Sequence, residues 1–260
     1  YAVVPGQRAV IYTNNSTVYA HIATLSEAGV KIEQIVDSRH KISEQEEGLA
    51  QAHSVPLLLG SQILDVKGWR AVSSVSVATP AGVINVSCDL VCHSGGWNPL
   101  VHLHSHAGGK PVFDEATATF VPGEPAQHEN CIGGAKGIFS ISQSIDDATD
   151  VAQTIVRDLS GQFAQPADNA VASGEIAYDI DVIWPDNELP GKAFVDFQND
   201  VTTSDIALAV RENFQSIEHV KRYTTAGMAV DQGKIGNPNV IGLVSRELGK
   251  DQEAISCYQK

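Results

Sequence analysis

Residues 8–37 read RAVIYTNNSTVYAHIATLSEAGVKIEQIVD, and their hydrophobic pattern decides the fold class. An apolar run at 8–13 precedes apolar residues at helical spacing over 16–29, and a second apolar run follows. This order is typical of a β-strand, a crossover helix and a second, parallel strand. Ser16 is expected to cap the helix and Gly29 to end it. The chain is therefore expected to be α/β, with a Rossmann-like βαβ unit of the nucleotide-binding type.

The rest of the chain extends this unit. A helix is expected over 43–53, before the apolar run VPLLLG, and the β-rich stretch 63–79 with the turn at Pro80-Ala81-Gly82 predicts an antiparallel excursion. Residues 130–156 predict a strand, a glycine turn and a long helix, and 201–228 predict two short helices. Thr202 or Thr203 is expected to cap the first of these.

Composition excludes several classes of protein. The chain has 260 residues, is 43% hydrophobic and carries a net charge of −14, which argues against nucleic-acid and membrane-surface binding. Its four cysteines form no CxxC pair, so a reducing compartment, the cytoplasm, is expected. No apolar stretch approaches the ~20 residues of a membrane span. The start without Met, a few residues before a strand, predicts an internal fragment of a longer protein.

The stretch HLHSH places His102, His104 and His106 at alternate positions. On a strand their imidazoles would share one face, as in several metal sites. The flanking Asn98-Pro99 and Ala107-Gly108-Gly109 disfavour a regular strand, and no acidic partner stands nearby. We therefore expect surface or loop histidines and no metal site, with adventitious metal binding left open.

The turn after the first strand bears on nucleotide binding. A dinucleotide-binding βαβ unit carries G-x-G-x-x-G there, so that the backbone can approach the pyrophosphate. Residues 13–18 read TNNSTV and contain no glycine. Asp37 stands at the end of the second strand, where a ribose-binding acid belongs, although an Asp at a strand end is common. Asp37 is kept as a cofactor-binding candidate, while the loop argues against an intact site.

Two later stretches resemble flavoprotein reductases with two dinucleotide folds. CDLVCHSGGWNP, residues 88–99, is similar to the strand and turn that close their pyridine-nucleotide domain. FVPGEPAQHENCIGGAKG, residues 120–137, resembles the return strand whose glycine-Asp turn reaches the flavin. Gly133 matches that turn and Gly134 stands where the Asp belongs. Both are candidate cofactor contacts, but the missing Asp argues against FAD binding.

Residues 192–234, KAFVDFQNDVTTSDIALAVRENFQSIEHVKRYTTAGMAVDQGK, closely resemble the alpha subunit of heterotetrameric sarcosine oxidase. Residues 94–123 match the middle region of the same family, and the resemblance runs from about 6 to 248. In that family the histidine-rich stretch is a variable loop without metal. The resemblance therefore supports the expectation that His102, His104 and His106 hold no ion.

The same C-terminal segment resembles a degenerate form of the small iron-sulfur domain of related amine and opine dehydrogenases. The positions of its four cysteine ligands correspond to Asp196, Gln198, Asp231 and Gly236. Because these clusters need thiolates, the resemblance implies a domain without an iron-sulfur cluster.

A short basic stretch offers a phosphate site. Two cations and two hydroxyls lie within five residues and precede Gly227: Lys221, Arg222, Thr224 and Thr225. Such a set can hold a phosphate through charge-assisted hydrogen bonds, although an exposed basic turn of a surface helix is the alternative. The family resemblance implies FMN shared between the alpha and beta subunits, and favours the phosphate site. Gln232 and Lys234 are weaker candidates.

The resemblance implies an activity for the whole enzyme. Sarcosine is oxidatively demethylated to glycine, a one-carbon unit passes to tetrahydrofolate, and hydrogen peroxide forms. The other subunits are beta, gamma and delta, and the beta subunit carries the amine-oxidising catalyst, so no catalytic residue is expected here. NAD belongs to the alpha subunit's large dinucleotide domain, whose site would be incomplete in this fragment.

The expected organisation has four parts: an α/β pyridine-nucleotide-type domain over 1–99, the returning half of the flanking dinucleotide domain over 100–158, a linker over 159–191, and a small helical domain over 192–250. Such a fragment is expected to be weakly stable or to self-associate, because the sheet edge that its missing half would cover is exposed. Two rival functions remain open. One is an NAD(P)H-dependent flavoprotein reductase, and the other is a noncatalytic assembly module.

Overall fold

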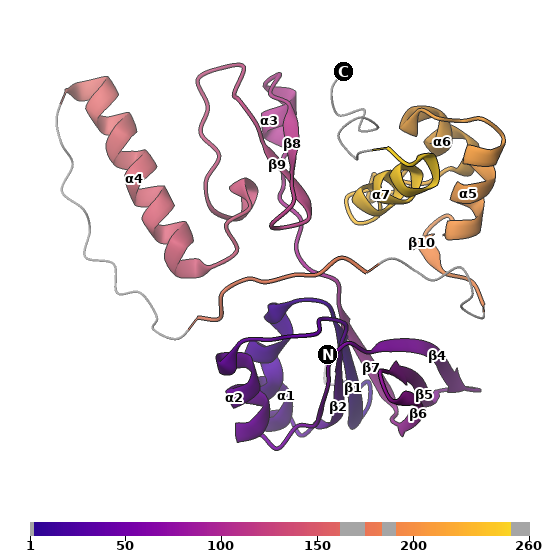
Figure 1. The fold of residues 1–260 in the computed structure, drawn as a ribbon. Coiled ribbons are helices and arrows are strands. Elements are labelled where there is room, and N and C mark those ends of the chain that lie inside the picture. Colours follow the sequence, from indigo (N-terminus) through magenta and orange to yellow (C-terminus); the bar gives the residue numbers. More distant parts are fainter. Residues whose placement is uncertain (1–2, 162–174, 184–190, 251–260) are drawn as a thin grey trace. The chain divides into compact units, whose positions relative to one another are not determined.

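The computed structural model describes residues 3–161, 175–183 and 191–250. These residues form two compact units. Unit 1 contains residues up to 97 together with 139–142 and 175–183, and unit 2 contains 98–138, 143–161 and 191–250 (Figure 1). Within these described ranges, no helix combines the length and the apolar character that a membrane crossing requires.

A parallel sheet forms the centre of unit 1, as the sequence predicts. The strand order is β3-β2-β1-β7, and all three neighbouring pairs are parallel. The crossover from β1 to β2 passes through a 3-10 helix, η1, and a short α-helix, α1. The bounds are β1 Arg8–Thr13, η1 Ser16–His21, α1 Ile22–Glu27, β2 Lys31–Asp37, α2 Glu44–Ala52, β3 Leu57–Leu58 and β7 Leu90–Ser94.

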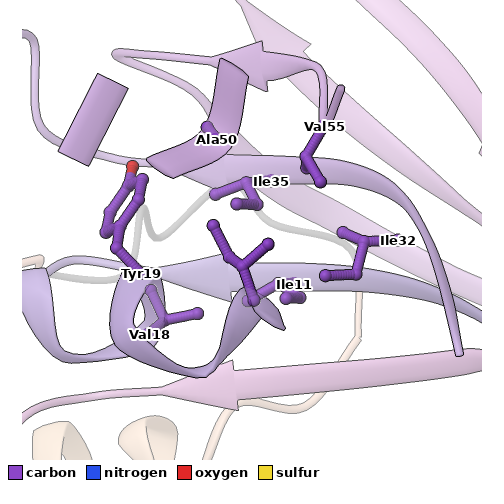
Figure 2. Close-up of a cluster of buried hydrophobic side chains, with 8 residues drawn as sticks. Ile11, Val18, Tyr19, Ile32, Ile35, Ala50 and Val55 are labelled. Carbon is purple, nitrogen blue, oxygen red and sulfur yellow. The ribbon is translucent and has the colours of Figure 1, made fainter. Parts of the chain in front are cut away.

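Buried aliphatic side chains hold the helices against this sheet. Figure 2 shows Ile11 from β1 and Ile32 and Ile35 from β2 beside side chains of η1 and α2. Ile11 and Ile35 are essentially fully buried. Each such side chain stabilises the fold by about 1.5–3 kcal/mol relative to its exposed state. The apolar spacing that predicts the βαβ unit is thus the spacing that fills this core.

The antiparallel excursion covers the other face of the sheet. Val10 of β1 and Val36 of β2 pack with Val75 and Val77 of the excursion and with Cys88. Because successive side chains of a strand point to opposite faces, β1 and β2 contribute to both cores. The excursion is a three-stranded antiparallel sheet made of β4 Gln62–Gly68, β5 Val72–Thr79 and β6 Gly82–Ser87.

Local capping explains where several helices begin. Ser43 forms a capping box with Glu46 at the start of α2, and Thr202 forms one with Asp205 in unit 2. The expectation that Ser16 caps the first helix is wrong, because the Asn15 side chain accepts the hydrogen bond from Thr17 N. Asparagine is at least as good an N-cap as serine.

Unit 2 begins with a short helix and a hairpin, and ends with three helices that contact one another. The histidine-rich stretch is helical rather than extended. The bounds are α3 His102–His106, β8 Pro111–Asp114, β9 Thr119–Pro122, η2 Gly133–Lys136, α4 Ile141–Ser160, β10 Phe194–Asp196, β11 Val201–Thr202, α5 Thr203–Arg211, α6 Ile217–Thr224 and α7 Asn237–Leu248.

The expected linker, 159–191, falls largely outside the described residues, which omit 162–174 and 184–190. Its first residues continue helix α4 to Ser160. Its described middle part, 175–183, packs on unit 1. That segment is called the strap below.

Helix α4 is amphipathic, yet none of its described side chains is buried. Ile155 is 39% exposed and Leu159 is 84% exposed, one turn apart on the same face. An apolar stripe of this kind normally packs against another element. Its exposure here leaves a surface available for association.

We expect the purified chain to self-associate through α4. The double substitution Ile155→Lys, Leu159→Lys should shift it toward monomer in light scattering coupled to size-exclusion chromatography, because it places two charges on the apolar stripe. Thr154→Lys with Ser160→Lys adds the same charge beside the stripe and should leave association unchanged. A natural chain that elutes as a monomer at every concentration would contradict this expectation.

Candidate functional site

The crevice between β1 and β7 is the first candidate site. From β1 the chain continues to β2 and β3 on one side, whereas β7 lies on the other side. This change of direction is the switch point at which open parallel sheets bind ligands, outside the carboxyl ends of the strands. The residues at this edge are those after Thr13 on β1 and Ser94 on β7.

Polar side chains of the turn after β1 are bonded within the chain. Asn15 is fully buried. Its carboxamide accepts from Thr17 N at 3.0 Å and donates to the Ser94 carbonyl at 3.0 Å. The Thr13 hydroxyl donates to the Asn15 carbonyl at 2.9 Å. Asparagine and threonine thus close the turn that glycines keep open in a dinucleotide site.

The strap, residues 175–183, lies across this turn (Figure 1). Ser16 N donates to the Asp179 carbonyl at 2.9 Å, and Asp179 N donates to the Ser16 hydroxyl at 3.0 Å. Asn14 forms a second pair with Asp181, because its carboxamide donates to the Asp181 carbonyl at 2.7 Å while its own carbonyl accepts from Asp181 N at 2.9 Å. The strap therefore takes backbone groups that a phosphate would need.

Side chains of the strap close the crevice from the β7 side. The Tyr178 hydroxyl accepts from Trp97 N at 3.1 Å, and Ile176 packs against the core of unit 1. A Cβ on Gly96 would approach the Ile180 Cδ1 atom to 2.6 Å and the Tyr178 hydroxyl to 2.8 Å. Gly96 also has φ +99°, which favours glycine. The absence of a side chain at Gly96 thus leaves room for Ile180 and Tyr178 of the strap, where a dinucleotide site would leave room for a pyrophosphate.

Asp37 lies in a buried ionic cluster and not on the wall of an open site. It is fully buried, and its carboxylate accepts from the Tyr19 hydroxyl at 2.8 Å and from Arg39 Nη2 at 2.8 Å. Arg39 also binds Glu46 at 2.8 Å and Asp179 of the strap at 2.9 Å. Both oxygens of the Asp37 carboxylate are thus bonded within unit 1.

The ionic cluster raises the pKa of two of its members, Tyr19 and Arg39. Burial raises the pKa of the Tyr19 hydroxyl, and the neighbouring Asp37 carboxylate raises it further. Burial opposes the charge on Arg39, but hydrogen bonds to Asp37 and Glu46 outweigh it and raise the pKa of the guanidinium. Tyr19 is therefore neutral and Arg39 charged at physiological pH.

The glycine turn of unit 2 is held by an acid from helix α4. Gly133 N donates to the Asp147 carboxylate at 3.2 Å, and Lys136 Nζ binds the same carboxylate at 2.6 Å. The hydrogen bond from Lys136 lowers the pKa of Asp147, and the Gly133 amide adds to this effect. A Cβ on Gly134 would meet open space. The amide that would approach a flavin is thus already bonded to an acid.

The basic candidates lie at the end of helix α6. Lys221 is half-buried and Arg222 is exposed, and neither forms an ion pair with any described residue. The Thr224 hydroxyl donates to the Val220 carbonyl at 2.8 Å, so it already has a partner within the helix. Positive charges in the last turn of a helix also complement its negative carbonyl end. This is the alternative role of Lys221 and Arg222.

Thr225 ends α6 in the left-handed region, with φ 65°. Its carbonyl accepts from the Asn199 carboxamide at 3.0 Å. Asp196, one of the positions that correspond to cluster cysteines, accepts from Gly227 N at 2.9 Å. Hydrogen bonds thus tie the β10 turn to the loop after α6.

Exposed apolar side chains surround this loop. Phe197 on the β10 turn is 75% exposed, and Val230 after α6 is 93% exposed. Met228 and Ile235 are also exposed. Exposed apolar residues that form a contiguous patch are typical of an interaction surface.

Asp231, Gly236, Gln232 and Lys234 lie in the loop between α6 and α7. Gly236 is the N-cap residue of α7. The structure ties Asp196 to Gly227 in the C-terminal segment, and it places Asp37 in unit 1 and Gly133 in the turn before α4.

Comparison with known proteins finds similarity along nearly the whole chain. A family model described as the sarcosine oxidase A3 domain matches residues 190–260. Sarcosine oxidase subunit alpha from Rhizobium meliloti (strain 1021) is 36% identical over 249 residues, which are 96% of this chain. The chain is similar to a segment of sarcosine oxidase alpha subunits.

Two further relatives extend this finding. Sarcosine oxidase subunit alpha from Corynebacterium sp. (strain U-96) is 29% identical over 98% of this chain. The chain spans 25% of the Rhizobium subunit and 28% of the Corynebacterium subunit. L-proline dehydrogenase from P. horikoshii has the same fold at 18% identity, with a TM-score of 0.64 over 98% of this chain and 48% of that chain.

We expect Asp37→Asn to destabilise unit 1 by about 3–5 kcal/mol, because it leaves Arg39 charged and incompletely paired in the interior. Urea unfolding followed through the NMR signals of β1 and β2 amides measures this change. Glu33→Gln removes an acid paired with Arg8 and Lys31 at the surface and should change the unfolding free energy little. Equal effects of the two substitutions would contradict a structural role for Asp37.

Proposed function

We propose that this chain is a segment of the alpha subunit of a sarcosine oxidase, in which it acts as a cofactor-holding and subunit-interface scaffold. The observation that carries the proposal is its similarity to alpha subunits over nearly its whole length. The whole enzyme would oxidise the N-methyl group of sarcosine, with glycine, a one-carbon unit for tetrahydrofolate, and hydrogen peroxide as products.

A scaffold role for unit 1 follows from its crevice. The residues there do not fit a dinucleotide, because the strap bonds to Ser16 and Asn14 and the Asp37 carboxylate is committed to Arg39. NAD would belong to a part of the alpha subunit that this chain lacks. The rival function, an NAD(P)H-dependent reductase, requires the same crevice to be open, so this arrangement disfavours it.

The C-terminal helices would hold the phosphate of FMN at the junction with the beta subunit. Lys221 and Arg222 supply two cations without ion-pair partners among the described residues, and Thr225 supplies an exposed hydroxyl. Thr224 supports the turn through its bonds to Val220 and Ala226. The exposed Met228 and Val230 would cover the edge of the interface. When bound, FMN supplies electron transfer toward oxygen.

No residue of this chain is assigned to amine oxidation, which would belong to the beta subunit. The gamma and delta subunits complete the proposed complex, and its expected compartment is the cytoplasm. A noncatalytic assembly module without any cofactor is the second candidate. The exposed apolar stripe of α4 favours a surface for assembly, and cofactor content separates the two candidates.

The test is co-expression of the chain with the beta subunit of a sarcosine oxidase, followed by flavin analysis of the purified complex. We expect FMN in the natural complex and at least a tenfold lower FMN content after Lys221→Ala with Arg222→Ala, because the phosphate loses both cations. Lys192→Ala with Arg211→Ala removes two cations elsewhere in the same helical region and should retain FMN.

Complex formation is scored separately by co-purification. A complex that forms and contains no FMN would favour the assembly module. A complex in which both double variants retain FMN would move the phosphate away from the end of α6. If the beta subunit does not bind this chain, the scaffold proposal itself fails.

A further inference from the structure

A second group of chemically active side chains lies in unit 2 and shares no residue with either candidate cofactor site. His104 of α3 meets Glu129 and Cys131, which follow the β8–β9 hairpin in the chain. One imidazole nitrogen, one carboxylate oxygen and the Cys131 Sγ atom all lie within 4.8 Å of one another. Residues 25 and 27 positions apart are thereby gathered at one point.

His104 is buried, and the other two members of the cluster are partly exposed. The His104 side chain is 1% exposed and that of Glu129 is 20% exposed. The Nδ1 atom of His104 lies 2.5 Å from the Glu129 carboxylate, whereas its buried Nε2 atom has no hydrogen-bond partner among the described residues. The ring nitrogen that faces the carboxylate is therefore Nδ1.

The surrounding backbone fixes the two segments together. The Gln127 carboxamide donates to the Ala107 carbonyl at 2.8 Å, which joins the loop before Glu129 to the end of α3. Gly109 N donates to the His104 carbonyl at 2.9 Å. Gly109 is buried, and a Cβ there would overlap the imidazole ring. The imidazole ring therefore packs directly against the backbone at Gly109.

We propose that His104, Glu129 and Cys131 bind a single borderline divalent cation of the zinc class. Nitrogen, carboxylate and thiolate donors together suit Zn²⁺, whereas a thiolate disfavours Mg²⁺ and Ca²⁺. Glutamate and cysteinate neutralise the two positive charges, and the neutral imidazole completes three protein ligands. The fourth position of a tetrahedral ion is left for water or for a donor from outside this chain.

The geometry needs only a small rearrangement. With metal–ligand bonds of about 2.0–2.3 Å, tetrahedral donors lie roughly 3.3–3.8 Å apart. The separation of up to 4.8 Å must contract by about an ångström, and the direct contact between His104 and Glu129 must open. An ion inserted between these two residues replaces their hydrogen bond with two coordination bonds.

This site departs from the expectation drawn from the sequence. The sequence argued against a metal site because the residues that flank the alternating histidines disfavour a regular strand and no acid stands beside them. The fold brings Glu129 to His104 from a distant loop. Only one of the three histidines takes part. His102 and His106 are exposed, which makes them natural controls.

The experiment titrates the metal-free chain with Co²⁺, whose absorption reports both geometry and thiolate coordination, and then displaces it with Zn²⁺. We expect one ion per chain and a thiolate-to-cobalt charge-transfer band. Cys131→Ser should abolish that band, and Glu129→Gln should weaken binding more than about 100-fold, since even an outer-shell partner is worth 10–100-fold. Cys88→Ser and His102→Asn with His106→Asn should change neither.

Several outcomes would overturn the site. They are a charge-transfer band that survives Cys131→Ser, ion binding lost in the His102 and His106 variant, or no stoichiometric binding by the natural chain. Because Cys131 is only partly buried, its serine variant should keep the fold, and far-ultraviolet circular dichroism checks this. Gly109→Ala offers a further test, since it displaces the imidazole without removing a donor and should weaken binding.

Discussion

Unit 1 depends on the ion pairs that the buried Arg39 side chain forms. This side chain is 3% exposed and binds Asp37 at the end of β2, Glu46 of α2, and Asp179 of the strap. A buried charge that loses its partner costs several kcal/mol, so these elements must be placed together. Glu46 also completes the capping box of α2. One guanidinium therefore fixes a strand end, a helix start and the segment that covers the crevice.

The filled crevice changes what this α/β fold does. A dinucleotide domain keeps its switch point open and presents backbone amides to a phosphate. Here Ser16 N donates to the Asp179 carbonyl, and Gly96 admits Tyr178 and Ile180. The α/β fold is retained, while the strap occupies the place where a dinucleotide would bind. This is the physical basis for the proposal that unit 1 is a support and does not bind a nucleotide.

Local patterns of the sequence predict the helices and strands. Contacts between residues far apart in the chain determine whether a candidate binding site is open. Apolar spacing locates β1 and β2, and the Ser43 and Thr202 caps follow from neighbours three residues away. The strap bonds to residues more than 160 positions earlier, and its small, polar surroundings suggest a linker. Asp37 stands where a ribose contact belongs, yet Arg39 two residues later captures it. The only early sign of the filled crevice is TNNSTV, where asparagines replace the glycines.

The most direct test of this account is a titration of the isotope-labelled chain with NAD⁺, followed through the backbone amide signals of residues 13–17 and of the strap. The account predicts no saturable shifts at millimolar NAD⁺ and slow hydrogen exchange at Ser16 and Asp181, whose amides are bonded between the turn and the strap. Saturable shifts at these amides, with faster exchange as the strap is released, would show that the crevice is a working nucleotide site and would contradict the account.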